Sequence, residues 1–246
     1  YLLGNLNDNF KTQDFNSLNI DQLPELEKYM LHQLYMLREN FTKNFEAYNF
    51  HTLYKDLLFF CTVDLSAFYF DIRKDSLYCD SKNSKRRGDC IKVLQIILES
   101  LLSWFAPILS FTTEEIFKLI NKEDNKSIHL GKFVKIPEHW KNETLNKKWI
   151  NIKKIRDASN ISIEEKRTEK VIGSSLEANI NIKLSKDLYE IAKDSDFAEI
   201  CITSGAKLIL DNNIDKKEVS VETFKAEGEK CSVCWKIKKG KCDRHG

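Results

Sequence analysis

The sequence predicts a mainly α-helical protein, in which an antiparallel helical bundle is followed by a small α/β module and a C-terminal metal-binding knuckle. Apolar residues recur at steps of three and four through most of residues 21–140, which is the period of an amphipathic helix. The period changes to strict alternation near residues 178–184, as in a half-buried strand. Four potential metal ligands then lie between Cys231 and His245, close to the end of the chain.

The first long helix is expected between residues 21 and 48. Asp21 and Pro24 suit its first turn, where acidic residues and proline are favoured. The apolar positions follow the helical period: Leu23, Leu26, Met30, Leu34, Leu37, Phe41, Phe45 and Tyr48. Such a stripe can bury one face of the helix against neighbouring helices.

A second and a third helix are expected to pack against the first. The second runs from about His51 to Ile72, and its many aromatic residues suggest deep burial. The polar segment DSKNSKRRGD separates it from the third, which keeps helical spacing from Ile91 to Phe105. Pro107 is expected to end or kink this third helix.

A short fourth helix is expected to begin with a capping box and to run to Ile120. Thr112 would be the N-cap, and Glu115 lies three residues later, where its side chain can bond back to the helix start. The four helices together predict the antiparallel bundle over residues 21–140.

The pattern changes after residue 140. Leu145, Trp149, Ile152 and Ile155 suggest one more helix, and strand-like alternation follows over residues 178–184. Two further strand candidates are Phe197–Thr203 and Val219–Phe224. We therefore expect a small α/β module over residues 141–225 and a metal-binding tail over residues 226–246.

Composition excludes some classes of protein and of partner. No apolar run approaches the roughly 20 residues that a bilayer span needs, so no membrane partner is expected. The seven cysteines are an odd number without a disulfide-like pattern, which favours a reducing cytoplasm. The net charge is only +2, so any binding of a polyanion must depend on local basic patches. The chain begins with Tyr1 rather than Met, and we expect it to be part of a longer polypeptide.

The strongest local signal is a pair of metal-ligand motifs in the tail. Cys231 and Cys234 form a C-x-x-C pair, and Cys242 and His245 form a C-x-x-H pair after seven intervening residues. Three thiolates and one imidazole are a known ligand set of structural Zn²⁺, and we expect one such ion. Lys230 is among the lysines that would favour the thiolate forms. Uncomplexed cysteines or a redox pair are the alternatives, and no neighbouring base supports catalytic zinc.

Basic and aromatic residues around this knuckle suggest contact with RNA. Trp235 has charged or small neighbours, so its indole could stack on an unpaired base, with Lys230, Lys236 and Lys238 beside it. The alternative is that Trp235 covers the metal cluster as a miniature core.

A second basic cluster precedes the third helix. Arg86 and Arg87 lie in it and could contact phosphates, although a solvated helix entrance explains the same charges.

Several motifs, taken in order, give the chain a family resemblance. They are YLLGNL at the start, YNFHTLYKDLLFFCTVDLSAFYFDIRKDSLYCD in the second helix, APILSFTTEEIF at residues 106–117, VIGSSLEA at residues 171–178 and KCSVCW at residues 230–235. In this order they resemble bacterial isoleucyl-tRNA synthetase, and the resemblance covers nearly the whole chain.

The resemblance implies the C-terminal region of a class I synthetase. Residues 1–20 would end the connection from the catalytic core, residues 21–140 would be the helical anticodon-binding bundle, residues 141–225 the junction module and residues 226–246 the zinc-binding tail that grips the anticodon loop. Cys242 matches a family ligand, whereas His245 stands where a cysteine is usual. The implied partner is tRNA-Ile, bound by a monomer in the cytoplasm.

The catalytic motifs of that family, HIGH and KMSKS, are absent from this chain. We therefore expect it to be inactive alone, with no catalytic residue of its own. ATP and Mg²⁺ would act only through a catalytic portion that joins isoleucine to tRNA.

Two other interpretations remain open at this stage. The anticodon-binding regions of valyl-, leucyl- and methionyl-tRNA synthetases share a similar helical layout. A stand-alone zinc-knuckle nucleic-acid binder is the interpretation from a different class, because a related zinc module occurs in some DNA glycosylases.

Overall fold

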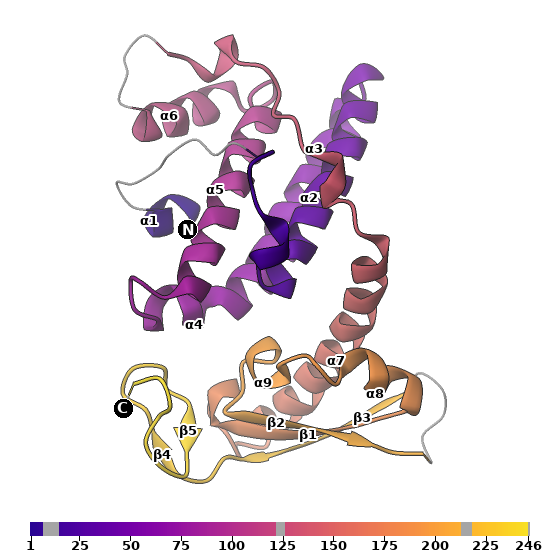
Figure 1. The fold of residues 1–246 in the computed structure, drawn as a ribbon, viewed down its shortest axis with the longest axis vertical. Helices are drawn as coiled ribbons and strands as arrows, with labels where there is room; N and C mark the ends of the chain where they lie inside the picture. The colour runs from indigo at the N-terminus through magenta and orange to yellow at the C-terminus, as the bar shows by residue number, and fades with distance from the viewer. Residues whose placement is uncertain (7–14, 122–125, 213–217, 246) are drawn as a thin grey trace. The chain divides into compact units, whose positions relative to one another are not determined.

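The computed structural model describes residues 1–6, 15–121, 126–212 and 218–245 (Figure 1). The chain divides into two compact units, Tyr1–Asn142 and Glu143–Gly246. The prediction of a mainly helical chain with a few strands and a Cys/His cluster near its end is confirmed. In the described part of the chain, no helix combines the length and the apolar character that a membrane crossing requires.

The first unit is built from helices alone in its described part. Three long helical segments form its centre, and shorter helices complete it. In chain order its elements are α1 Leu2–Leu6, η2 Ile20–Gln22, α2 Glu25–Glu46, α3 Phe50–Phe59, η3 Phe60–Phe70, α4 Asp71–Cys79, α5 Lys85–Phe105, α6 Ser110–Ile120, η4 Ile128–Leu130 and η5 Glu138–Trp140.

Helix α2 is shorter at both ends than its apolar pattern predicts. It begins at Glu25, after Pro24 as its N-cap residue, because proline supplies no N–H and fixes a φ suited to a helix entrance. It ends at Glu46, and Tyr48 adopts a left-handed φ of 54° with 81% of its surface exposed. The last apolar position of the stripe therefore lies outside both the helix and the core.

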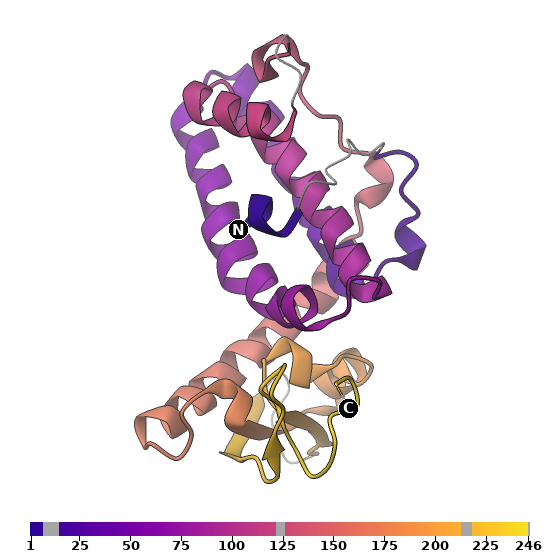
Figure 2. The same ribbon diagram turned by 90° about the vertical axis from the view of Figure 1, so that its left-hand side faces the viewer.

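The second predicted helix is longer than expected. The helical segment from Phe50 continues through the π-helical η3 to Cys79, so the expected end at Ile72 is wrong (Figure 2). The side chain of Asn49 caps its start by accepting a hydrogen bond from the N–H of Thr52. Asp71 and the polar residues after it do not end the helix, since one face continues to bury apolar side chains.

A buried polar network links three of these helices. Arg73 of α4 donates two hydrogen bonds of 2.6 Å to the carboxylate of Glu27 in α2, and neither side chain is more than 5% exposed. The hydroxyl of Tyr69 donates to the same carboxylate at 3.1 Å and lies 3.5 Å from the Cys90 sulfur of α5. Burial raises the pKa of Tyr69 well above its usual value, so it stays a donor.

Helix α5 ends before Pro107 as predicted, but the capping box expected for the next helix is wrong. Helix α6 begins at Ser110, two residues before the expected N-cap Thr112. Thr113 is buried and donates its hydroxyl to the Leu109 carbonyl, so the first turn is already closed there.

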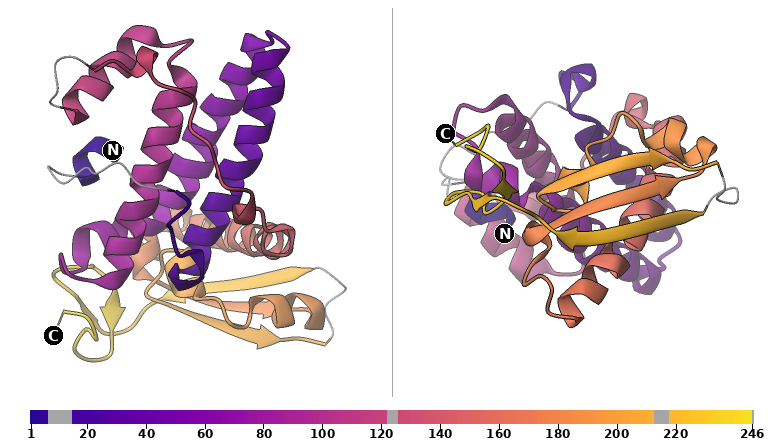
Figure 3. Two further views of the ribbon diagram at one scale, coloured as in Figure 1. Left: turned by 45° about the horizontal axis from the view of Figure 1, so that its top comes forward. Right: turned by 90° about the horizontal axis from the view of Figure 1, so that it is seen from below.

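The second unit is an α/β module with a small appended hairpin (Figure 3). Strand β1 is the centre of a three-stranded sheet of order β2-β1-β3, parallel to β2 and antiparallel to β3. Helix α7 packs on β3 and β1, and α8 and α9 pack against β2. The elements are α7 Glu143–Thr168, η6 Ser175–Glu177, β1 Ala178–Leu184, α8 Lys186–Ala192, α9 Phe197–Ile200, β2 Gly205–Leu210, β3 Val219–Lys225, β4 Glu229–Lys230 and β5 Ile237–Lys238.

One expected strand is a helix. The segment Phe197–Thr203 begins with α9, because the side chain of Asp196 accepts the N–H of Glu199 and caps a helical turn. The strand lies immediately after it, in β2, which the sequence pattern did not indicate. The predictions for β1 and β3 agree with the structure to within one residue.

Candidate functional site

A short hairpin presents the predicted metal ligands. Strands β4 and β5 pair through Lys230 and Ile237, and the N–H of Cys231 donates to the carbonyl of Lys236 at 2.9 Å. Gly228 enters the hairpin with a φ of +128°, and a Cβ at this position would lie 2.1 Å from the backbone carbonyl oxygen of Lys238. The hairpin therefore requires glycine at residue 228.

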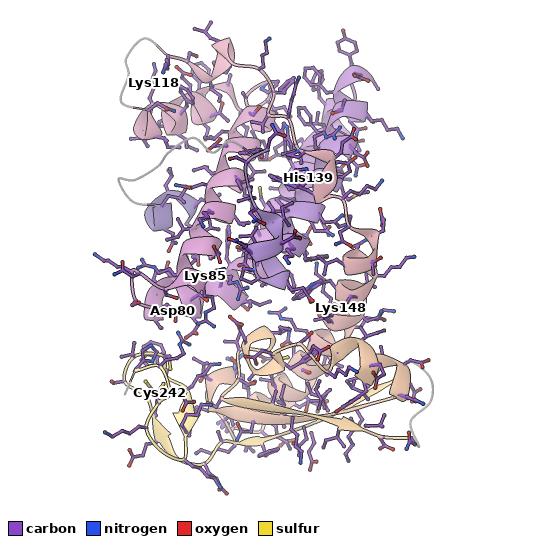
Figure 4. The ribbon with its side chains drawn as sticks, viewed as in Figure 1. Asp80, Lys85, Lys118, His139, Lys148 and Cys242 are labelled. Carbon is purple, nitrogen blue, oxygen red and sulfur yellow. The ribbon has the colours of Figure 1, made fainter. Side chains whose placement is uncertain are left out.

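The four predicted ligand side chains converge on one point. Their Sγ and ring-nitrogen atoms all lie within 4.8 Å of one another. The Sγ atoms of Cys234 and Cys242 are 3.8 Å apart, and the Nδ1 of His245 lies 3.6 Å from Cys231 Sγ and 3.4 Å from Cys242 Sγ. A disulfide needs an S–S distance of about 2.05 Å, so the sulfurs of Cys234 and Cys242 are not bonded to each other. The Cys3His cluster, which includes the loop at Cys242 in Figure 4, can hold a metal ion.

Backbone N–H groups prepare two of the thiols for metal binding. The N–H groups of Cys234 and Val233 lower the pKa of the Cys231 thiol to about 6. The N–H of Arg244 is the main group that lowers the pKa of the Cys242 thiol. Burial raises the pKa of Cys234 to about 11, so a cation that binds there must displace the proton of this thiol. The groups that favour the thiolates of Cys231 and Cys242 are therefore first of all backbone donors of the turns, and not the neighbouring lysines that the sequence suggests.

A buried serine of the module holds the hairpin in place. The Oγ of Ser204 accepts the N–H of Ile237 at 2.6 Å and donates to the carbonyl of Leu176. The N–H of Ser204 donates to the carbonyl of Ala178 in β1. The knuckle is thus tied to the sheet and is not an independent appendage.

The side chain of Trp235 lies at the surface of the knuckle. It is 59% exposed, and its backbone has a φ of 64°, which turns the chain sharply after Cys234. The ammonium of Lys230 lies 5.6 Å from the centroid of the indole. An indole this exposed is available to a ligand and is not a core residue. The side chains of Lys236 and Lys238, one and three residues further along the chain, are half-buried.

Comparison with known protein families matches the helical unit and the first part of the second unit. Residues 27–182 match a family described as the anticodon-binding domain of tRNA ligase.

The chain belongs to this family of anticodon-binding domains.

Three bacterial relatives of this anticodon-binding chain are isoleucine–tRNA ligases. The protein of Pelagibacter ubique is 66% identical over 245 residues, which are 100% of this chain and 27% of the relative. The protein of Agrobacterium fabrum is 42% identical over 87% of the chain and 23% of the relative, and that of Mesorhizobium japonicum is 38% identical over 91% and 24%. The chain thus spans about a quarter of the length of these relatives.

Within the anticodon-binding domain, the two predicted arginines lie in the first turn of α5. Arg86 donates from Nε to Asp80 at 2.9 Å and from Nη2 to Asp80 at 3.1 Å and Asp75 at 3.4 Å (Figure 4 labels Asp80 at the end of α4). A phosphate would therefore have to compete with two carboxylates for Arg86. Arg87 is half-buried, and its Nε is buried without a hydrogen-bond partner among the described residues. Phosphate contact by either residue stays a prediction.

Sequence reasoning missed Gly228 and Ser204. Gly228 lies three residues before the first cysteine of the C-x-x-C pair, and a glycine there is a weak sign of a turn. Ser204 carries no local signal, because its partners are 28 and 33 residues away in the chain.

Proposed function

We propose that this chain is a tRNA-binding part of an isoleucine–tRNA ligase, with tRNA-Ile as its partner. The observation that carries the proposal is the 66% identity to an isoleucine–tRNA ligase over 245 residues, combined with the match to the anticodon-binding domain of tRNA ligase. The activity of the longer enzyme would be to join isoleucine to tRNA-Ile in the cytoplasm, with ATP and Mg²⁺ bound by residues other than those of this chain.

The proposal assigns a role to each part of the chain. Residues 21–140 would bind the anticodon arm, residues 141–225 would join this domain to the tail, and residues 226–246 would contact the anticodon loop. Residues 1–20 would connect to the catalytic core. The chain would act as a monomer.

The metal proposed for the Cys3His cluster is one structural Zn²⁺. For tetrahedral Zn²⁺ with Zn–S of about 2.3 Å and Zn–N of about 2.05 Å, two sulfurs are about 3.8 Å apart and a sulfur and a nitrogen about 3.6 Å apart. The distances of 3.8, 3.6 and 3.4 Å between the ligand atoms agree with these values. When bound, the ion would supply the cross-link that holds both ends of the hairpin. His245 would thereby be the fourth ligand.

The tRNA contacts proposed for the tail follow from exposure and charge. Bases of a tRNA loop can be unstacked, and an exposed indole offers them a stacking surface. Lys230, Lys236 and Lys238 would hold the adjacent phosphates, because ammonium groups bind the backbone without regard to sequence. The helical unit would add Arg86 and Arg87 at the start of α5. To contact phosphates, Arg86 would have to leave the carboxylates that it binds, and Arg87 would have to become more exposed.

Trp235→Ala tests the proposal. It is expected to weaken binding of a tRNA-Ile transcript by about 1 to 3 kcal/mol, since this is the usual contribution of one stacked base. Fluorescence anisotropy with labelled tRNA measures the change, and Trp235→Phe is the matched control that keeps a smaller stacking surface. Because the indole is largely exposed, the stability of the fold is expected to stay the same. An unchanged dissociation constant would remove Trp235 from the interface.

A further inference from the structure

The second unit has a sheet face that none of its described helices covers. In β1, Ala178, Ile180 and Ile182 are buried beneath the helices, and Asn179 and Asn181 alternate with them and face the other side. The right-hand view of Figure 3 looks onto this second face, with the strands in front of α7. The open face is therefore a surface of the module that the metal site does not use.

The strand register places nine residues on this open face in three rows, eight of them with side chains and one a glycine. The rows run across β3, β1 and β2 in that order: Phe224, Asn179 and Gly205; Glu222, Asn181 and Lys207; Ser220, Lys183 and Ile209.

Two contacts confirm which way the first row faces. The hydroxyl of Thr223 lies 2.8 Å from that of Ser162 in α7, so the next residue of β3, Phe224, faces away from the helix. A Cβ added to Gly205 would lie 2.7 Å from the Asn179 side-chain oxygen, so the Asn179 amide lies over the glycine. The result is a flat strip that begins with the Phe224 ring, which is 41% exposed.

The polar groups of this face have no partners in the described part of the chain. The side chains of Asn179, Asn181, Lys183 and Lys207 make no hydrogen bond or ion pair with any described residue. The face carries a net positive charge, because it has the two ammonium groups of Lys183 and Lys207 and the single carboxylate of Glu222.

We propose that this open sheet face binds unpaired nucleotides of the tRNA, which extends the RNA contact beyond the bundle and the zinc tail. The inference rests on the proposed function. An exposed aromatic ring on a sheet can stack a base, amides can hydrogen-bond base edges, and lysines can hold phosphates. A protein partner would need a more apolar face, and only Phe224 and Ile209 of the nine residues are large and apolar.

Four variants of the whole 246-residue chain test the inference. Phe224→Ala removes the ring, and Phe224→Tyr keeps it. Lys207→Ala removes one ammonium group from the open face, and Lys186→Ala removes one from α8, which packs against the sheet from its other side. Far-UV circular dichroism and thermal melting establish that each variant is folded.

The measurement is the dissociation constant for a tRNA-Ile transcript over a series of KCl concentrations. We expect Phe224→Ala to weaken binding about fivefold or more and Phe224→Tyr to bind as the parent does. Lys207→Ala should reduce the salt dependence by about one phosphate contact, while Lys186→Ala should not. With 4-thiouridine in the transcript, a photo-crosslink should map to the β3 peptide.

Two results would overturn the inference. If the parent chain binds tRNA and neither Phe224→Ala nor Lys207→Ala differs from it, the open face is not an RNA surface, and the proposed function still stands. If the parent chain binds no tRNA, the proposed function is wrong, and this inference, which rests on it, is wrong as well.

Discussion

Removal of the metal is expected to unfold the tail and to spare the helical unit. Among the described tail residues 226–245, only Ala226 and Cys234 are buried. Burial of two such small side chains contributes about 2 kcal/mol, whereas a structural zinc site contributes about 10 to 16 kcal/mol at neutral pH. We therefore expect the hairpin to depend on the proposed metal, and its affinity for Zn²⁺ should correspond to a dissociation constant of about 10⁻⁷ to 10⁻¹² M.

The chain offers a specific probe for this experiment. Trp104, Trp140 and Trp149 are at most 3% exposed, whereas Trp235 is 59% exposed and is the one tryptophan in the tail. A chelator titration should change the emission of Trp235 alone. Amide exchange should accelerate in residues 229–238 and stay slow in α2 and α5, and three thiols should become reactive toward a thiol reagent.

A cysteine substitution provides the matched control. Cys234→Ser should reproduce the effect of the chelator, and Cys61→Ser, at a half-buried cysteine outside the cluster, should leave metal content and tail protection unchanged. Tail amides that stay protected after the metal has gone, or a helical unit that melts together with the tail, would refute the reasoning.

Three further substitutions test the contacts that support the fold and the site. Glu27→Ala should destabilise the first unit by about 3 to 5 kcal/mol, because it leaves the buried Arg73 guanidinium without its carboxylate, and a loss below about 1 kcal/mol in urea unfolding would contradict this. Gly228→Ala should weaken zinc affinity about tenfold or more, because residue 228 has a positive φ and the added Cβ would collide with the carbonyl oxygen of Lys238. Gly240→Ala is the control, since its Cβ would have no atom within 4 Å, and it should bind zinc normally in a competition titration. Ser204→Ala should cost about 1 to 3 kcal/mol by leaving the hairpin amide unsatisfied, and faster exchange of that amide with zinc still bound is the expected signature.

The helices could be predicted because their signals are local. The apolar stripe of α2 reports the buried face directly, and Leu26, Met30 and Leu34 are buried as that stripe implies. The stripe could not give the helix end, because Tyr48 continues the period although the chain has already turned. At Phe197–Thr203, the cap from Asp196 outweighed the apolar character that suggested a strand.

Of the sites, only those whose residues lie close together in the chain could be predicted from the sequence. The metal ligands can be read from spacing, because each C-x-x-C or C-x-x-H turn brings its two side chains together within four residues. Ser204 and the open sheet face could not be read in this way. They depend on strand register and on hydrogen bonds between residues about 30 positions apart, which the linear pattern does not contain.

The most direct test of the central claim is the relative affinity of the zinc-loaded chain for three nucleic acids at matched salt. These are a tRNA-Ile transcript, a tRNA-Val transcript and a DNA duplex of similar length. A tRNA-binding part of an isoleucine–tRNA ligase should bind tRNA-Ile most tightly and duplex DNA most weakly. Equal affinity for duplex DNA and tRNA-Ile would contradict the claim and would favour a general nucleic-acid-binding knuckle.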